Sequence, residues 1–155
     1  MNYFDITIVN AENRENMFSL LKLADDSEDK IREYIHEGEL YEVSQNNHTV
    51  GAILLTFPAK YEVEIKNMAL IHTKRGQGIG KKLIQDVCTI YRRKGYLSMI
   101  VGTANSSIGN LAFYQKAGFR FNSIKKDYFN SYKEPIMEYG IQAVDMIILK
   151  KSLYK

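Results

Sequence analysis

Hydrophobic and polar positions follow two different periods in the first half of the chain. Residues 3–9 alternate and are rich in β-branched side chains, which predicts a strand. Apolar residues at a helical spacing then predict a helix around 17–24 and a second helix from Ser27 to Gly38. Three further strands are expected, and Pro58 should end the second of them. They lie at residues 40–44, 49–57 and 61–71.

The second half of the chain alternates strands with helices. A loop at 72–80 leads into a helix whose apolar stripe continues to Tyr91 and which ends at Gly95. A buried strand, a short helix, a strand, a long polar loop and a last strand follow. These lie at residues 97–101, 108–118, 119–124, 125–140 and 144–149. This order indicates one α/β or α+β domain over residues 1–155, built on a single sheet.

Length and composition are those of an ordinary globular domain. The chain has 155 residues, of which 45% are hydrophobic and 25% charged. The lone Cys88 excludes an intramolecular disulfide and a cysteine-based metal cluster. Residues 1–7 lack the pattern of a signal peptide, and no run approaches the ~20 apolar residues that cross a bilayer. We therefore expect a cytoplasmic protein with no membrane partner.

Charge is distributed unevenly along the chain. Residues 1–46 contain 11 acidic and 4 basic side chains, a balance of −7, whereas residues 47–155 contain 7 acidic and 17 basic ones, a balance of +10. Together they give the net charge of +3. This asymmetry suggests an anionic ligand near the basic part and a cationic one near the acidic part. The alternative is that these charges only solvate exposed helix faces.

A glycine-rich turn, Arg75-Gly76-Gln77-Gly78-Ile79-Gly80, lies between a predicted strand and an amphipathic helix. Glycines let the backbone approach a ligand, and free amides at a helix start attract anions, above all a pyrophosphate. A tight turn without a ligand is the alternative. The turn is not a P-loop, since Arg75 stands where that loop needs glycine and Lys82 where it needs Ser or Thr. A dinucleotide fingerprint would need its third glycine at Lys81 or Leu83.

The pattern Arg-x-x-Gly-x-Gly, formed by Arg75, Gly78 and Gly80, resembles the acyl-CoA loop of the GNAT superfamily of N-acetyltransferases. Three other segments are similar to that family's central strand, tyrosine-bearing helix and last strand. They are Ile65–Leu70, Asn110–Phe119 and Asp145–Leu153. The resemblance covers most of residues 50–153. It implies a single mixed, mostly antiparallel twisted sheet flanked by helices, and an acetyl-CoA-dependent N-acetyltransferase.

The resemblance also implies where the co-substrate acetyl-CoA is bound. The pyrophosphate of coenzyme A would lie against the glycine-rich turn and the residue that follows it. These are Arg75, Gly76, Gln77, Gly78, Ile79, Gly80 and Lys81. Main-chain groups of Met68, Ala69 and Leu70 would pair with the pantetheine arm like an added strand. The family often has an asparagine where this chain has Ser107, so Asn105 or Asn110 would take over its hydrogen bonds.

Two residues are candidates for the proton transfers of acetylation. An alkylamine with a pKa of ~10.4 is protonated at neutral pH, so a base is useful. Glu64 lies five residues before Ala69, where some members of the family place a catalytic glutamate. An exposed carboxylate without a role, with a water chain as the base, is the alternative. Tyr114 would donate to the departing thiolate, and no covalent intermediate or metal is expected.

The expected activity is transfer of acetyl from acetyl-CoA to a primary amine of a small acceptor by direct attack. The acidic balance of residues 1–46 suggests a cationic acceptor, and the loop at 125–140 is expected to help form its site. One alternative is an acyl-CoA sensor without turnover. A nucleic-acid-binding module using the basic segment 74–94 is another, but that segment lacks interleaved aromatic residues. We expect no nucleic-acid partner, and the resemblance allows a homodimer.

Overall fold

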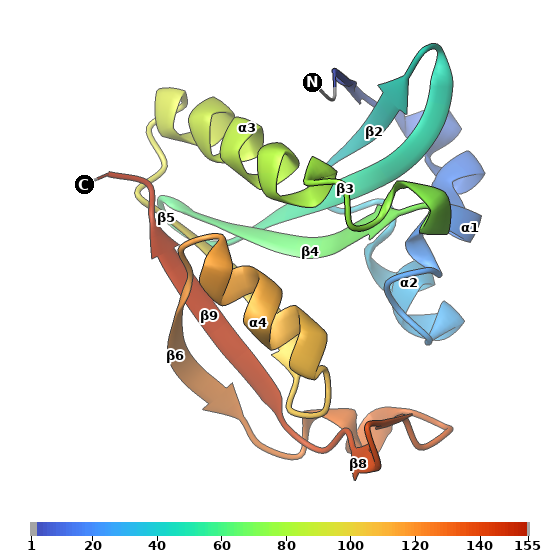
Figure 1. The fold of residues 1–155 in the computed structure, drawn as a ribbon, viewed down its shortest axis with the longest axis vertical. Coiled ribbons are helices and arrows are strands. Elements are labelled where there is room, and N and C mark those ends of the chain that lie inside the picture. The colour runs from blue at the N-terminus through green and yellow to red at the C-terminus, as the bar shows by residue number, and fades with distance from the viewer. Residues whose placement is uncertain (1–2, 155) are drawn as a thin grey trace.

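The computed structural model describes residues 3–154, which form a seven-stranded sheet and a separate two-stranded hairpin (Figure 1). The seven strands are ordered β1-β2-β3-β4-β5-β9-β6, and β4 and β5 are the parallel neighbours among them. Their bounds are β1 Asp5–Ile8, β2 Glu39–Gln45, β3 His48–Ala59, β4 Glu62–Leu70, β5 Ser98–Ala104, β6 Arg120–Lys125 and β9 Met146–Ser152. The predicted mixed, mostly antiparallel sheet is confirmed.

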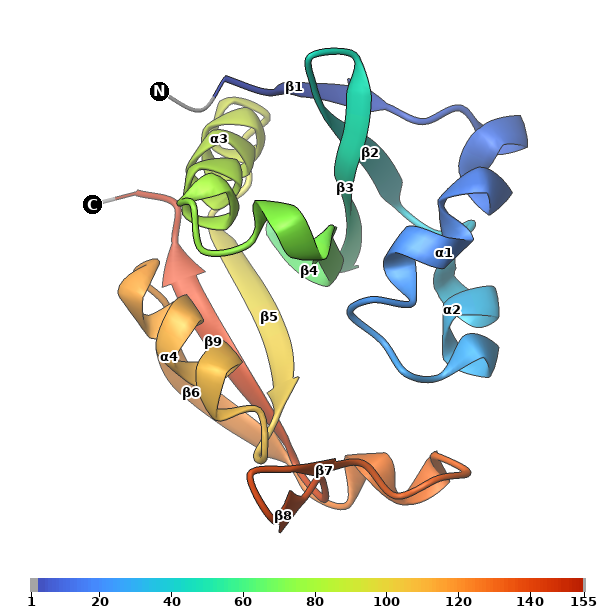
Figure 2. The ribbon, with the colours of Figure 1, turned by 45° about the vertical axis from the view of Figure 1, so that its right-hand side comes forward.

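Helices flank both faces of this sheet (Figure 2). The α-helices are α1 Phe18–Leu21, α2 Glu28–Tyr34, α3 Ile79–Arg93 and α4 Ile108–Lys116. Short 3-10 helices are η1 Ala11–Met17, η2 His72–Lys74 and η3 Tyr128–Ser131. None of the helices between residues 3 and 154 is both long enough and apolar enough to cross a bilayer.

Strand β3 supplies side chains to two separate cores. Ile53 and Leu55 pack in a cluster that includes the buried stripe of α3 and Tyr114 of α4. Ala52 and Leu54 point to the other face, where they pack with residues of α1 and α2. Successive residues of a strand point to opposite faces, so this unbroken apolar run fits a strand covered on both sides. The central strand β3 therefore lies between two helical layers, α3 and α4 on one face and α1 and α2 on the other.

The expectation that Pro58 ends a strand was wrong. Strand β3 continues through Pro58 to Ala59. Its ladder with β4 changes register between Thr56 and Ala59, and its pairing with β2 stops at Leu55. Proline lacks an N–H group and is tolerated where the ladder demands none.

Two other segments differ from the sequence-based expectation. Within the predicted helix at 17–24, the α-helix α1 covers only Phe18–Leu21, and Met17 is the last residue of the 3-10 helix η1 before it. The segment 125–140 is not a plain loop, because it contains η3 and the start of a small hairpin of β7 (Met137–Glu138) and β8 (Ile141–Gln142). Tyr139 and Gly140, both with positive φ, form the tight turn of that hairpin.

Candidate active site

Strands β4 and β5 pair along only part of their length. Their parallel ladder ends at the pair Ile65–Val101. Beyond it, β5 continues to Ala104 alongside β9, and β4 continues to Leu70 alongside β3 (Figure 2). The β4 edge at residues 66–70 on the β5 side therefore has no strand partner within residues 3–154, and we call this opening the β4–β5 fork. Such an edge presents N–H and C=O groups to which an extended molecule can add.

A β-bulge at Lys66 marks the start of the fork. Leu54 pairs with Asn67 and Leu55 pairs with Ile65, so Lys66 is an extra residue in β4. A bulge bends a strand and increases its twist, which is a physical reason for β4 to part from β5. The bulge also changes which face of the sheet the side chains occupy. In a regular strand Ile65 and Asn67 would share a face, but here Ile65 packs in the core under α3, whereas Asn67 contacts α1 and α2.

The glycine-rich turn leads from η2 into α3 with two residues in the left-handed region. Gly76 has φ +75° and Gly78 has φ +83°, and neither has a heavy atom within 4 Å of the position that a Cβ would take. Gly78 is the N-cap of α3, makes no side-chain cap, and is followed by a first turn without acidic residues. The first amides of α3 therefore have no intrahelical partner and attract an anion.

Side chains around the turn fix it to its neighbours. Arg75 Nε donates to Leu70 O at 3.1 Å, which ties the turn to the end of β4. Gln77 Nε2 donates to Thr73 O at 2.9 Å. A Cβ at Gly80 would lie 3.1 Å from the ring of Phe113, so the first turn of α3 packs closely against α4. The Ile79 side chain is buried, which leaves only its backbone to face a ligand, while Lys81 is exposed at the surface.

Tyr114 lies on the buried side of α4, with its ring edge-to-face against Phe113 and Phe119. The side chain is 7% exposed. Burial raises the pKa of the Tyr114 hydroxyl to about 12. None of the residues from 3 to 154 hydrogen-bonds this hydroxyl. The Tyr114 phenol is therefore protonated at neutral pH, and its O–H can donate a hydrogen bond to a ligand.

Glu64 and Glu62 lie on the same face of β4 but differ in their partners. Glu62 forms an ion pair with Lys150 at 3.5 Å. Glu64 accepts a hydrogen bond from Thr56 Oγ1 at 3.4 Å and makes no ion pair within the described part of the chain. Glu64 is also the nearer of the two to the fork, one residue before the last β4–β5 pair. Their partners and their distance along β4 from the fork thus distinguish Glu64 from Glu62, whereas strand alternation in the sequence places both on the same face and cannot distinguish them.

The two candidate asparagines are used differently. Asn105 Oδ1 accepts from the backbone amides of Val144 and Asp145, and its Nδ2 donates to Gln142 O. Its side-chain amide therefore holds the segment that enters β9. Asn110 is exposed on α4 and makes no side-chain hydrogen bond to another described residue. Ser107, at the family's asparagine position, donates to Glu138 Oε1 at 2.6 Å.

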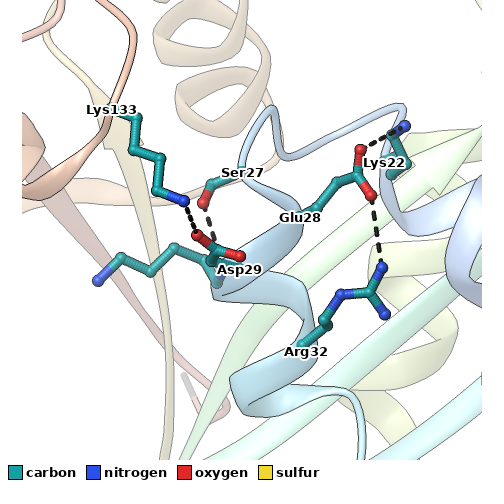
Figure 3. A network of polar contacts seen from close by, with 7 residues as sticks. Lys22, Ser27, Glu28, Asp29, Arg32 and Lys133 are labelled. Atoms are coloured by element: carbon teal, nitrogen blue, oxygen red, sulfur yellow. Dashed lines mark hydrogen bonds and ion pairs between the residues drawn. The ribbon is translucent and has the colours of Figure 1, made fainter.

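Several carboxylates of the acidic region are neutralised within the protein (Figure 3). Glu28 lies between Lys22 and Arg32, at 3.1 and 3.5 Å. Asp29 pairs with Lys133 of the segment 125–140 at 2.8 Å, and this hydrogen bond lowers the pKa of Asp29. The acidic region therefore presents less free charge than its composition suggests.

A buried hydrogen-bond chain next to the fork escaped the sequence analysis. Asn67 Nδ2 donates to Leu21 O and to the Tyr34 hydroxyl, both at 2.9 Å. The Tyr34 hydroxyl donates to Asp25 Oδ2 at 2.9 Å, and the Tyr132 hydroxyl approaches Asp25 Oδ1 at 3.5 Å. The available signal was a polar residue at a buried position of β4, whose residues alternate between half-buried and buried.

Comparison with known proteins agrees with this geometry. The acetyltransferase (GNAT) family model matches residues 7–119. The uncharacterized N-acetyltransferase YvbK of Bacillus subtilis (strain 168) is 37% identical over 143 residues, which cover 92% of each chain. Among solved structures, a GNAT family acetyltransferase from Elizabethkingia anophelis with acetyl-CoA bound has a TM-score of 0.90 at 39% identity, covering 96% of this chain and 97% of that one.

A second solved structure, a Bacillus subtilis acetyltransferase in complex with CoA, has a TM-score of 0.87 at 35% identity. The match covers 97% of this chain and 99% of that chain. Sequence, fold and the forked sheet lead to one conclusion. The chain belongs to the GNAT family of acetyl-CoA-dependent N-acetyltransferases.

Proposed function

We propose that this enzyme transfers the acetyl group of acetyl-CoA to a primary amine of a small acceptor by direct attack. The observation that carries the proposal is the β4–β5 fork. One end of its open edge, at Leu70, is tied to the glycine-rich turn through Arg75. The other end, at Ile65, adjoins Glu64. An acyl-CoA laid along this edge has its pyrophosphate at the turn and its thioester toward Glu64.

The residues along the fork fit coenzyme A in the order that its chemistry requires. The first amides of α3 and Lys81 would bind the pyrophosphate. Backbone groups of Met68, Ala69 and Leu70 would pair with the amides of the pantetheine arm. Asn110 is the better placed of the two candidate asparagines, because Asn105 is occupied by three hydrogen bonds of its own. The two solved relatives support this proposal, since they were crystallised with acetyl-CoA and with CoA.

In the proposed reaction, the amine nitrogen bonds to the acetyl carbon and the carbon–sulfur bond breaks. Glu64 takes the proton that the amine loses, directly or through one water. Tyr114 stabilises the departing thiolate. With a pKa of about 12, the phenol is roughly 3.5 units less acidic than an ordinary thiol, so complete proton transfer would cost about 5 kcal/mol. Tyr114 therefore acts mainly as a hydrogen-bond donor to sulfur, and the thiolate leaves as the weaker base.

An acetyl-CoA turnover screen tests the proposal. Purified enzyme is mixed with acetyl-CoA and with alkylamines, diamines, aminosugars, amino acids and arylalkylamines, and both free thiol and acetylated product are measured. We expect thiol release to match formation of an N-acetyl product for at least one primary amine. Tight CoA binding without turnover on any amine would favour the acyl-CoA sensor instead.

A further inference from the structure

Asn67 has an unusual place in β4. It is the second residue beyond the last β4–β5 pair, and its side chain points to the face that carries α1 and α2. Because Met68–Leu70 would pair with the pantetheine arm, the thioester end of the donor would lie near Asn67. This step rests on the proposed function.

The orientation of the Asn67 amide is fixed by its neighbours. Its Nδ2 donates to Leu21 O, and a carbonyl can only accept, so nitrogen and not oxygen must face that group. The second Nδ2 hydrogen goes to the Tyr34 hydroxyl, whose own hydrogen goes to Asp25. Burial raises the pKa of Tyr34 far above its usual range, so this hydroxyl remains a donor to Asp25. The chain of donors therefore runs in one direction, from Asn67 to Asp25.

The oxygen of the same amide has no hydrogen-bond partner in the part of the chain that the structure describes. Asn67 is 5% exposed, and its Oδ1 is buried with no hydrogen bond to any described residue. Buried polar atoms are almost always paired, so an unpaired one at a fixed position requires an explanation. The other such atom, Gln45 Oε1, lies at the β2–β3 hairpin, away from the fork. Asn67 Oδ1 is thus a pre-oriented acceptor that needs an N–H or O–H donor.

We propose that Asn67 Oδ1 accepts one N–H of the attacking amine and makes the enzyme selective for primary amines. A neutral primary amine has two hydrogens and one lone pair. Asn67 would hold one hydrogen, Glu64 would receive the other, and the lone pair would then attack the acetyl carbon. The nitrogen becomes positive as the new bond forms, so the hydrogen bond to Asn67 strengthens in the transition state. A secondary amine has a single hydrogen and cannot satisfy both residues.

The test compares Asn67→Ala with Tyr34→Phe, a matched control that removes a partner of the Asn67 amide but leaves Oδ1 in place. Both are assayed with the best primary amine of the screen and with its N-methyl derivative. We expect Asn67→Ala to lower kcat/KM for the primary amine by roughly 10- to 100-fold, with unchanged CoA affinity. The preference for the primary over the N-methyl amine should fall by about the same factor. In Tyr34→Phe, that preference should be unchanged.

Equal losses for the two amines in Asn67→Ala, or equal losses in Asn67→Ala and Tyr34→Phe, would make Asn67 a purely structural residue and overturn the inference. Thermal unfolding is measured for each variant. If Asn67→Ala does not fold, Asn67→Cys, whose thiol is only a weak donor and a weak acceptor, replaces it in the same comparison. A parent enzyme that acetylates no amine would instead overturn the proposed function, and the inference with it. The parent assay therefore separates the two failures.

Discussion

The two sides of the β4–β5 fork are built in different ways. On the side of α3 and α4, the surface assigned to coenzyme A consists mainly of backbone: the open β4 edge, two glycines with positive φ and the first amides of α3. On the side of α1 and α2, the surface consists of side chains from distant segments, joined through Asp25. Both the Tyr132 and the Tyr34 hydroxyl contact the Asp25 carboxylate, although these tyrosines lie 107 and 9 positions from Asp25 in the sequence.

This difference matches the chemistry of the two substrates. Acetyl-CoA is the same molecule for every member of the family. A site that would bind its pyrophosphate and pantetheine through backbone groups depends on residues close together in the sequence, so short motifs can identify it. The proposed acceptor site would instead be formed by side chains that meet only after folding. Changes on the backbone side should therefore abolish the donor site, whereas changes on the other side should adjust the rate or the choice of acceptor.

The largest effect is expected from Gly78→Val. A β-branched side chain at φ +83° strains the backbone by at least about 1–2 kcal/mol and places atoms where the pyrophosphate would lie. CoA binding measured by calorimetry should be lost. Gly95→Val is the matched control, because Gly95 follows the other end of α3, has φ +94° and is equally open. It should lose comparable stability but bind CoA normally. Normal binding by folded Gly78→Val would remove the turn from the donor site.

Tyr114→Phe should come second. It removes only the hydroxyl, so turnover should fall by roughly 10²-fold while CoA affinity and fold are nearly kept. Because burial raises the Tyr114 pKa to about 12, the phenol stays protonated through neutral and mildly alkaline pH. Its ionisation should therefore add no alkaline decline to the parent pH–rate profile below about pH 11. Turnover within a few-fold of the parent would leave Tyr114 as a packing residue.

Glu64→Gln should have an intermediate effect that depends on pH. Turnover should fall by about tenfold at pH 7 and recover partly toward pH 10, where the amine loses its proton without help. Glu62→Gln serves as the control, since Glu62 shares the face of β4 but is paired with Lys150. It should change turnover less than twofold at either pH. Profiles of identical shape for Glu64→Gln and the parent would give the role of base to water.

The sequence predicted the backbone side of the fork better than the other side. Strand alternation and helical periodicity located α2, α3, α4 and the strands of the main sheet, but not η1. The spacing of Arg75, Gly78 and Gly80 identified the family. Local pattern could not show that the β4–β5 ladder stops at Ile65, next to a one-residue bulge relative to β3, because both features belong to the pairing between strands. Nor could it show the bond from Asn67 to Tyr34, which joins residues 33 positions apart. The error at Pro58 has a similar origin, since only the register shows that no N–H is needed there.

The smallest effect concerns the charge of the acceptor. The acidic balance of residues 1–46 predicts a cationic acceptor, but Glu28 and Asp29 are paired with cations of the protein itself. Asp26 is exposed and forms no ion pair with another residue in the range 3–154. The attraction should therefore be modest and act over several ångströms of solvent. Raising the ionic strength from ~0.1 to ~1 M shortens the Debye length from ~10 to ~3 Å, so such attraction should nearly vanish.

For a cationic acceptor, kcat/KM should fall by about two- to fivefold over this range, mainly through KM, and a neutral amine of similar size should show no such change. Asp26→Asn should reproduce part of the loss at low salt and have no effect at high salt. The salt series and the Asp26→Asn variant together separate steering by charge from a general effect of salt on the enzyme. Only with steering does added salt remove the difference in kcat/KM between Asp26→Asn and the parent. A best acceptor that is neutral or anionic, or a cationic one whose kcat/KM ignores ionic strength, would show that these carboxylates only solvate α2 and the turn before it.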